Sequence, residues 1–279
     1  MRLSLDDLVA RARAAEAAGF TGIALMDHLA PPQALDQPMY EAMLTAAVLA
    51  AGTERLRVGH LVLCDAFRHP AVLAREAVTL DHASGGRFDL GIGWGSVTDE
   101  FVTYGIGSTE ARHRVTRLGE TLEIVRALWT GAPLDFTGEH FTLEGAAQQP
   151  VPLGRIPIVI GGAGKRTMEL VAAHADWWNV PVHRLDRLDE MRPLAGAARV
   201  SVQQMVTFVG DESARDRTEE LAVRRFGHMG SARVTGGPDE LRAHFASLAA
   251  SGVERVYAWF SDFAPADTLA AFGAGVIAR

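Results

Sequence analysis

Four clusters of glycine and ionisable residues stand where apolar, strand-like runs of the sequence end. The clusters are Asp27-His28, Cys64 to Pro70, Gly91 to Ser96, and Gly161 to Thr167. A helical pattern follows each cluster, so the strands should run parallel and their ends should meet at one edge of a sheet. In a (β/α) barrel that edge is the carboxyl-terminal face, where active sites are built. The placement of the clusters therefore predicts an enzyme.

Asp27-His28 offers a general acid or base with a carboxylate beside it in the sequence. Neighbours on a strand point to opposite faces, so Asp27 need not contact His28. A lone histidine at a strand end is more often a hydrogen-bonded structural group. The other clusters at the same sheet edge favour His28 as the catalytic residue.

The strand predicted around residues 88–95 carries bulky apolar residues on one face and glycines on the other. The glycines are Gly91, Gly93 and Gly95. A stripe without side chains lets a flat ring approach the backbone closely. The alternative is tight packing inside a barrel, which explains one glycine better than three.

The segment Gly161–Thr167 joins a predicted strand to a predicted helix. Its backbone amides, the helix dipole and the cations Lys165 and Arg166 suit a phosphate group. It is not a P-loop, because Val159 occupies the position of the first glycine. It is not the dinucleotide-binding motif either, because Thr167 stands where the third glycine belongs. An ordinary turn between strand and helix is the alternative.

Cys64 is the only cysteine, which excludes an intramolecular disulfide framework. No neighbouring group argues for a reactive thiolate, so we expect a buried thiol. His60 and His69 can approach one another, but the histidine spacing indicates no metal site.

Length, composition and charge narrow the classes of protein to consider. The chain has 279 residues and is 48% hydrophobic, enough for one large α/β domain. Its net charge of −7 argues against a nucleic acid or an anionic membrane surface as partner. Its first 20 residues are too charged for a signal peptide, and no apolar run is long enough to cross a bilayer. We expect a cytoplasmic protein that acts on a small molecule.

The periodicity of apolar residues predicts seven strands within a single domain that spans residues 1–279. The strands are expected at 21–27, 55–63, 87–93, 156–161, 176–180, 200–209 and 253–260. Helices are expected at 5–18, 39–51, 70–82, 112–129, 165–174, 213–226, 238–250 and 266–277. An insertion at about 96–155 holds the helix 112–129 and a hairpin near 134–141. Such an insertion is too long for a plain connection and usually covers a site.

Seven strands are one short of a closed eight-stranded barrel. Either the barrel starts further along the chain or one of its strands is missing. Residues 1–4 are too few for a strand and a loop before the first predicted helix. We therefore expect a gap between the strands at 21–27 and 253–260.

Taken together, the clusters resemble the bacterial luciferase-like superfamily, in particular its deazaflavin (coenzyme F420)-dependent oxidoreductases. The resemblance extends over about residues 4–277. The matching elements are Met26-Asp27-His28, Phe67 to Pro70, Asp81 to Gly95, the helix ending at Trp129, Gly161 to Thr167, Ala175 to Asn179, and Gly252 to Phe260.

The resemblance implies a TIM-like (β/α)8 barrel, apparently lacking its first strand, that binds the deazaflavin across its carboxyl-terminal face. It implies that His28 acts as the acid or base. It also implies that a bulge at Leu61 to Cys64, which often contains a non-prolyl cis peptide in this family, supports one face of the deazaflavin ring. The implied cofactor contacts are Asp27, Leu61, Val62, Cys64, Trp94, Gly95, Asp99, Gly161, Gly162, Gly164, Lys165 and Arg166.

The leading hypothesis is hydride transfer between F420 and a small organic substrate. The alternatives are an FMN-dependent monooxygenase of the same superfamily and a catalytically impaired cofactor-binding homologue. Ser96 stands where the sugar-phosphate dehydrogenases of the family carry a catalytic glutamate, which argues against that particular activity. The resemblance also implies a homodimer. Sedimentation velocity at micromolar concentration tests this expectation, and a monomer alone would contradict it.

Overall fold

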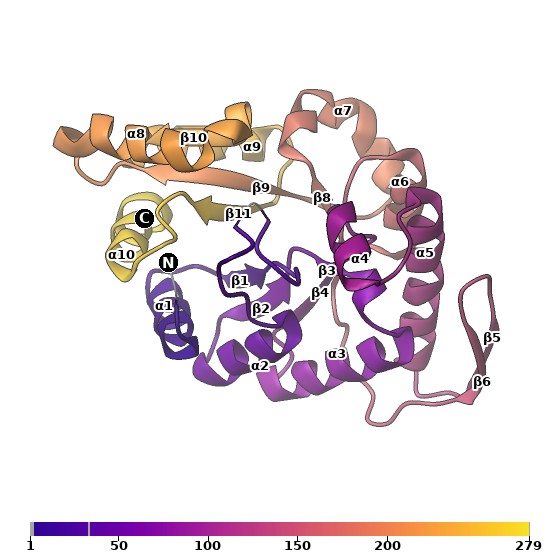
Figure 1. Cartoon of the computed structure of the whole chain (residues 1–279). Coiled ribbons are helices and arrows are strands. Elements are labelled where there is room, and N and C mark those ends of the chain that lie inside the picture. The colour runs from indigo at the N-terminus through magenta and orange to yellow at the C-terminus, as the bar shows by residue number, and fades with distance from the viewer. Residues whose placement is uncertain (1–2, 33, 279) are drawn as a thin grey trace.

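The computed structural model describes residues 3–32 and 34–278, and within them parallel strands form most of a barrel surrounded by helices (Figure 1). The strand order around the sheet is β1 (Gly22–Leu25), β2 (Arg57–His60), β4 (Phe88–Gly93), β7 (Ile158–Gly161), β8 (Trp177–Val180), β9 (Arg199–Phe208) and β11 (Arg255–Phe260). Every neighbouring pair is parallel, so the carboxyl ends of the strands lie at one end of the barrel. The seven predicted strands are confirmed.

Two short strands extend this sheet. The first, β3 (Leu63–Cys64), continues β2 after an irregular segment and pairs with β4. The second, β10 (Arg233–Gly236), pairs with the last four residues of β9 and was not expected from the sequence. It is too short to show an alternating pattern of its own.

Helices cover the outside of the barrel, and an insertion after β4 carries a hairpin. The outer helices are α1 (Leu5–Ala17), α2 (Ala42–Gly52), α3 (Pro70–Ser84), α6 (Lys165–His174), α7 (Leu188–Met191), α8 (Arg215–Phe226), α9 (Pro238–Ala250) and α10 (Ala266–Phe272). The insertion contains α4 (Thr98–Tyr104), α5 (Ala111–Leu128), β5 (Leu134–Thr137) and β6 (Thr142–Ala146). The predicted hairpin is confirmed, because β5 and β6 are antiparallel and project from the side of the molecule (Figure 1). None of the described helices is both long and apolar enough to cross a membrane.

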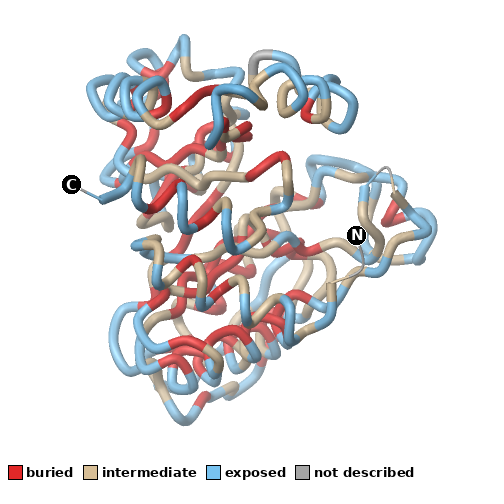
Figure 2. Tube along the Cα trace, turned by 90° about the vertical axis from the view of Figure 1, so that its left-hand side faces the viewer, coloured by how far each residue is buried: buried red, intermediate tan, exposed pale blue. Residues whose placement is uncertain are grey.

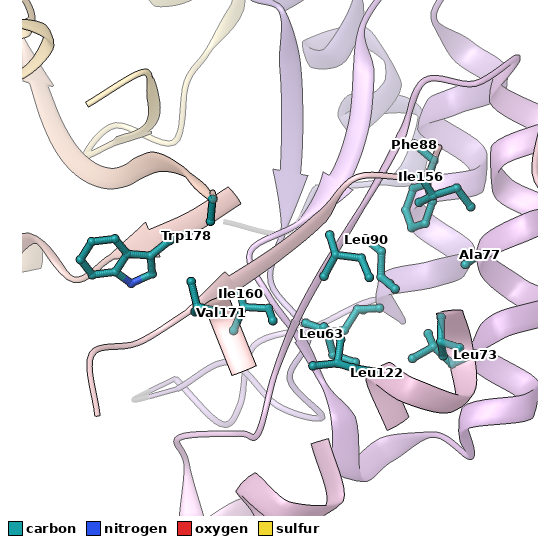
Figure 3. Packing of buried hydrophobic residues seen from close by; sticks show 14 of the residues in the cluster. Leu63, Leu73, Ala77, Phe88, Leu90, Leu122, Ile156, Ile160, Val171 and Trp178 are labelled. Carbon is teal, nitrogen blue, oxygen red and sulfur yellow. The ribbon is translucent and has the colours of Figure 1, made fainter. Parts of the chain in front are cut away.

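The main core lies between the barrel and its helices, beneath α3 and α5. Every residue of β4 is buried, as expected of a parallel strand covered on both faces. Leu90 and Ile160 belong to the same buried cluster as Leu73 of α3 and Leu122 of α5 (Figure 3). Figure 2 shows that the inner segments of the molecule are buried and that the outer faces of the helices are exposed. This core fixes the ends of β4 and β7.

The glycine stripe on β4 is occupied by neighbouring protein. A Cβ atom at Gly91 would lie 1.7 Å from the backbone oxygen of His60, and one at Gly93 would lie 2.8 Å from Val62. These glycines therefore let the adjoining strand and bulge approach closely. The expectation that the stripe leaves room for a flat ring is wrong at these two positions, and tight barrel packing explains them.

The barrel wall is open between β1 and β11, as expected. Within the described residues no ladder joins these two strands and no third strand lies between them. Most residues of both strands are only partly buried, so water reaches the edges and can satisfy their backbone groups. Outside the opening α1 packs against α10, and Phe20 stacks on Phe272 with ring centroids 5.6 Å apart (Figure 1). The helical layer is therefore continuous where the sheet is not.

An ionic cluster crosses the barrel interior near the amino ends of the strands. Asp89 of β4 accepts hydrogen bonds from Arg57 Nε at 3.0 Å and from Arg255 Nη1 at 2.9 Å. The Arg255 guanidinium also lies 3.8 Å from the centroid of the Trp177 ring. Because Arg255 belongs to β11, Asp89 ties one edge of the opening to the far side of the barrel.

We expect Asp89→Asn to destabilise the fold. The Asp89 side chain is 9% exposed, and its loss of charge leaves two guanidinium groups without their counter-ion. Both cations are partly solvated, so we expect the free energy of unfolding to fall by about 2–3 kcal/mol, less than for a fully buried pair. Urea denaturation followed by circular dichroism measures the change. Glu220→Gln, on the exposed face of α8, is the control and should change stability by less than about 0.5 kcal/mol; equal midpoints for both variants would contradict the prediction.

Candidate active site

His28 follows β1 and is held by a buried carboxylate from the insertion. Its Nδ1 atom lies 2.8 Å from Oε2 of Glu100 in α4, while Oε1 of Glu100 accepts a hydrogen bond from the Leu29 amide at 2.7 Å. Glu100 is 8% exposed. An ionised carboxylate can only accept, so Nδ1 carries the hydrogen and Nε2 of neutral His28 keeps its lone pair. This arrangement suits an acid/base histidine.

Glu100 is a residue that the sequence reasoning missed. The resemblance pointed to its neighbour Asp99 as a cofactor contact, but Asp99 is exposed and Glu100 is the residue that reaches His28. Successive helical residues project about 100° apart, so only one of these two acids faces the barrel. The short helix α4 has too few apolar residues for the sequence to show which one. A cofactor contact by Asp99 stays a prediction.

Asp27 is directed away from His28 and braces the backbone. Its carboxylate accepts hydrogen bonds from the Cys64 amide at 2.9 Å and from Arg68 Nη1 at 2.6 Å. Arg68 also pairs with Glu41, so the end of β1 is tied to the segment after β2 and to the start of α2. β1 ends at Leu25, before both residues, and their separate partners agree with the expectation that Asp27 need not contact His28. The structure gives Asp27 a clear role in the fold, and its cofactor contact stays a prediction.

An irregular segment joins β2 to β3 at the carboxyl-terminal edge. The peptide bond between Leu61 and Val62 is cis, as the resemblance implies. The Leu61 amide donates to the Leu25 carbonyl at 2.8 Å, which keeps the segment in line with β1. Cys64 is buried, and burial raises the pKa of its thiol to about 12. The thiol is therefore protonated at neutral pH, as expected of a structural cysteine.

The loop Gly161 to Gly164 leads into α6 with an open amino terminus. Gly164 is the N-cap residue, and among the described residues no side chain bonds to the free amides of the first turn. The loop shape is fixed by the Trp178 indole, which donates to the Gly162 carbonyl at 2.7 Å. Lys165 and Arg166 are exposed, and neither forms an ion pair with another described residue. Two free cations beside uncapped amides fit a phosphate group.

Trp94 connects the end of β4 to this loop. Its indole nitrogen lies 3.3 Å from Thr167 Oγ1, and the Arg114 guanidinium lies 5.0 Å from the centroid of its rings. The next residue, Gly95, has φ +81°, and a Cβ there would lie 2.5 Å from the Phe101 ring. Only glycine fits this turn without strain. The turn places α4, and with it Glu100, beside the barrel.

The structure thus brings the predicted site residues to one end of the barrel, where β1, β2, β4 and β7 end. A cavity of about 270 Å³ opens at the same end, above β8, β9 and β11. Within the described residues no three histidine, cysteine or acidic side chains come together as metal ligands would. The arrangement therefore combines an anion-binding loop, a histidine–carboxylate pair and a cavity.

The luciferase-like monooxygenase family model matches residues 2–244. The chain belongs to this family. It is 29% identical over 227 residues to the F420-dependent hydroxymycolic acid dehydrogenase of Mycobacterium tuberculosis, over 77% of this chain and 62% of that protein. It is 38% identical over 162 residues to the F420-dependent glucose-6-phosphate dehydrogenase of Mycolicibacterium fortuitum, over 57% and 48% of the two chains. The matched regions thus span 62% and 48% of the lengths of these relatives.

Solved structures of the family share this fold. An F420-dependent secondary alcohol dehydrogenase superposes with a TM-score of 0.84 at 17% identity, covering 99% of this chain and 95% of that one. The coenzyme F420-dependent tetrahydromethanopterin reductase of Methanopyrus kandleri gives 0.79 at 18% identity, with the same coverage. The EDTA monooxygenase of Chelativorans sp. BNC1 gives 0.82 at 15% identity, covering 98% and 86% of the two chains. The nearly closed parallel barrel is therefore the luciferase-like fold.

Beneath the cis peptide of this luciferase-like barrel lies a histidine that is buried without charge. His60 is 1% exposed, its Nε2 lies 3.2 Å from the Ala42 carbonyl, and its Nδ1 has no partner among the described residues. Burial lowers the pKa of His60 from 6.5 to about 4. Between pH 6.5 and pH 4, His60 is therefore protonated in the unfolded chain but neutral in the folded protein.

We expect His60 to make stability fall as the solution is acidified from pH 6.5 to pH 4. In that window the unfolded chain binds the proton and the folded chain does not, so stability decreases by about 1.4 kcal/mol per pH unit, up to about 3 kcal/mol. His60→Leu should remove this component, and urea denaturation at several pH values measures it. The exposed His228→Gln variant is the control and should keep the wild-type slope. A His60→Leu slope equal to that of the wild type would contradict the low pKa.

Proposed function

We propose that this protein is an F420-dependent oxidoreductase that transfers a hydride between the deazaflavin and a small organic substrate. The observation that carries the proposal is the pair formed by His28 and buried Glu100 at the carboxyl end of the barrel. The choice of F420 is supported by the names of the relatives, which include several F420-dependent dehydrogenases.

The residues at this end of the barrel fit such a cofactor. The uncapped start of α6, with Lys165 and Arg166, would hold its phosphate, and the bulge at Leu61 and Val62 would back its ring. When bound, the deazaflavin supplies or accepts the hydride. The protein's own contribution is to position the substrate and to move a proton.

His28 would handle that proton through Nε2. When an alcohol is oxidised, neutral His28 takes the hydroxyl proton as the carbon–oxygen bond becomes a carbonyl. In the reverse direction protonated His28 returns the proton to the oxygen. Glu100 holds the ring in one tautomer and balances the positive charge of the protonated imidazole. Such proton transfer typically contributes about 10²–10⁴-fold to the rate.

We expect His28→Ala to lower turnover by about 10²-fold or more while the dissociation constant for F420 changes by less than about twofold. Glu100→Gln should lower turnover by about tenfold, because the imidazolium loses its counter-charge. Steady-state kinetics over pH 5–9 with equilibrium titration of F420 separates the two effects. Glu144→Gln, an exposed acid on β6, is the control. Parallel losses of turnover and cofactor affinity would identify His28 as a structural residue.

We expect the cations of the α6 loop to set cofactor affinity. Lys165→Ala and Arg166→Ala should each weaken F420 binding by about tenfold, because each removes a charged hydrogen-bond donor to phosphate. Quenching of protein fluorescence by F420 and, separately, by FMN measures both affinities. Arg224→Ala, on exposed α8, should bind F420 as the wild type does. Micromolar binding of FMN without binding of F420 would replace this proposal with the FMN-dependent alternative, and F420 binding without any hydride transfer would favour an impaired homologue.

A further inference from the structure

The cavity at the carboxyl end of the barrel has a composition that bears on the substrate. It is lined by residues of β8, β9 and β11, by Gly162 of the loop after β7, and by the segments after β8 and before β10. On β9, Ser201 bonds to Asn179 of β8, and Gln203 and Met205 follow at intervals of two toward the cavity. Trp259 of β11 is the register partner of Met205. The two side chains therefore form adjoining parts of the wall.

The described residues that line this cavity carry no aspartate, glutamate, lysine or arginine. Its ionisable lining residue is His183, which is exposed at the mouth. The ionic cluster of Asp89, Arg57 and Arg255 lies further down the barrel interior, near the amino ends of the strands. The cations of the α6 loop serve the cofactor phosphate in the proposed function. A phosphate or carboxylate buried here would lack a charged partner, which is costly.

The walls of the cavity are mainly apolar. Val180, Val182, Met205, Met229 and Trp259 are the larger apolar side chains among the lining residues. The polar lining side chains are Asn179, His183 and Gln203. Asn179 accepts a hydrogen bond from Ser201, whereas the Gln203 side chain makes no hydrogen bond with another described residue, unlike its neighbour Gln204, which bonds to the Ala232 carbonyl. A neutral amide offers one acceptor and two donors, which match a hydroxyl or a carbonyl group.

We propose that the substrate is an uncharged, partly apolar alcohol or ketone, whose oxygen is recognised by Gln203 and whose hydrocarbon part packs on Trp259 and Met205. This inference rests on the proposed function. It separates the chain from the relatives named glucose-6-phosphate dehydrogenases, whose substrate carries a phosphate. The specificity of the site follows from its lack of charge.

Arg233 is the residue whose substitution tests whether the cavity binds a negatively charged substrate. It follows Ala232 at the start of β10, is the register partner of Met205, and its Nη1 is buried with no hydrogen-bond partner among the described residues. It does not line the cavity. Because its register partner Met205 lines the cavity, substitution of Arg233 tests whether any anion that binds there depends on this cation.

The first experiment measures equilibrium binding to the protein without cofactor, so that it does not depend on turnover. Ketones from acetone to 2-octanone and glucose 6-phosphate are titrated by ligand-observed NMR. We expect ketone affinity to rise about threefold per added methylene group until the cavity is filled, and we expect no saturable binding of glucose 6-phosphate. Saturable binding of glucose 6-phosphate that Arg233→Met abolishes would overturn the proposal.

The second experiment measures reduction of F420 by the matching alcohols and by glucose 6-phosphate. Trp259→Ala should raise KM for 2-hexanol about tenfold with little change in kcat, and Gln203→Leu should raise KM for every alcohol. Val223→Ala, on exposed α8, is the control. Alcohol kinetics unaffected by Gln203→Leu, or faster turnover of glucose 6-phosphate, would reject the assigned substrate class. If the protein does not bind F420, the proposed function is rejected. The ketone titration needs no cofactor, so it still tests whether the cavity binds uncharged ketones.

Discussion

The opening between β1 and β11 leaves two strand edges without a hydrogen-bonded neighbour, and the rest of the barrel must hold these two edges in position. A sheet edge exposes backbone groups that must bond to water or to another strand. Here water reaches both edges, and side chains hold them in position. Outside, Phe20 packs on Phe272 and meets Phe260 edge to face. Inside, Asp89 binds Arg255 from across the barrel. The wall is thus held together by packing and ion pairing at the place where a hydrogen-bonded ladder is missing.

The end of β1 shows how strand geometry separates structural work from chemistry. Asp27 turns toward the Cys64 amide and Arg68, whereas His28 turns toward Glu100. Both residues follow the last residue of β1, Leu25, and because their side chains have separate partners they bind different parts of the structure without competing. The partner of His28 comes from α4, which belongs to the insertion after β4. In the proposed function, the insertion supplies the partner of the acid/base histidine as well as a covering layer.

The parts of the structure that depend on local pattern could be predicted from the sequence. Helices α6 and α9 occupy the predicted ranges 165–174 and 238–250, since caps and apolar spacing are local signals. The features that depend on distant contacts could not. Nothing local distinguishes Glu100 from Asp99, because the choice is set by the position of His28. In the same way, Gly91 is explained only when the backbone of His60 is seen against it.

The distribution of charge within the barrel connects these features. Asp89 and its two arginines occupy the amino-terminal half of the interior, and Lys165 with Arg166 lies at the rim. Between them the cavity is lined by neutral groups. In the proposed reaction a proton must arrive on His28, which is largely buried at the same end of the barrel, and an isolated buried charge is costly. Glu100 already stands 2.8 Å from the ring, so the proton converts an unbalanced carboxylate into a balanced ion pair. The buried acid therefore makes proton transfer compatible with an otherwise uncharged site.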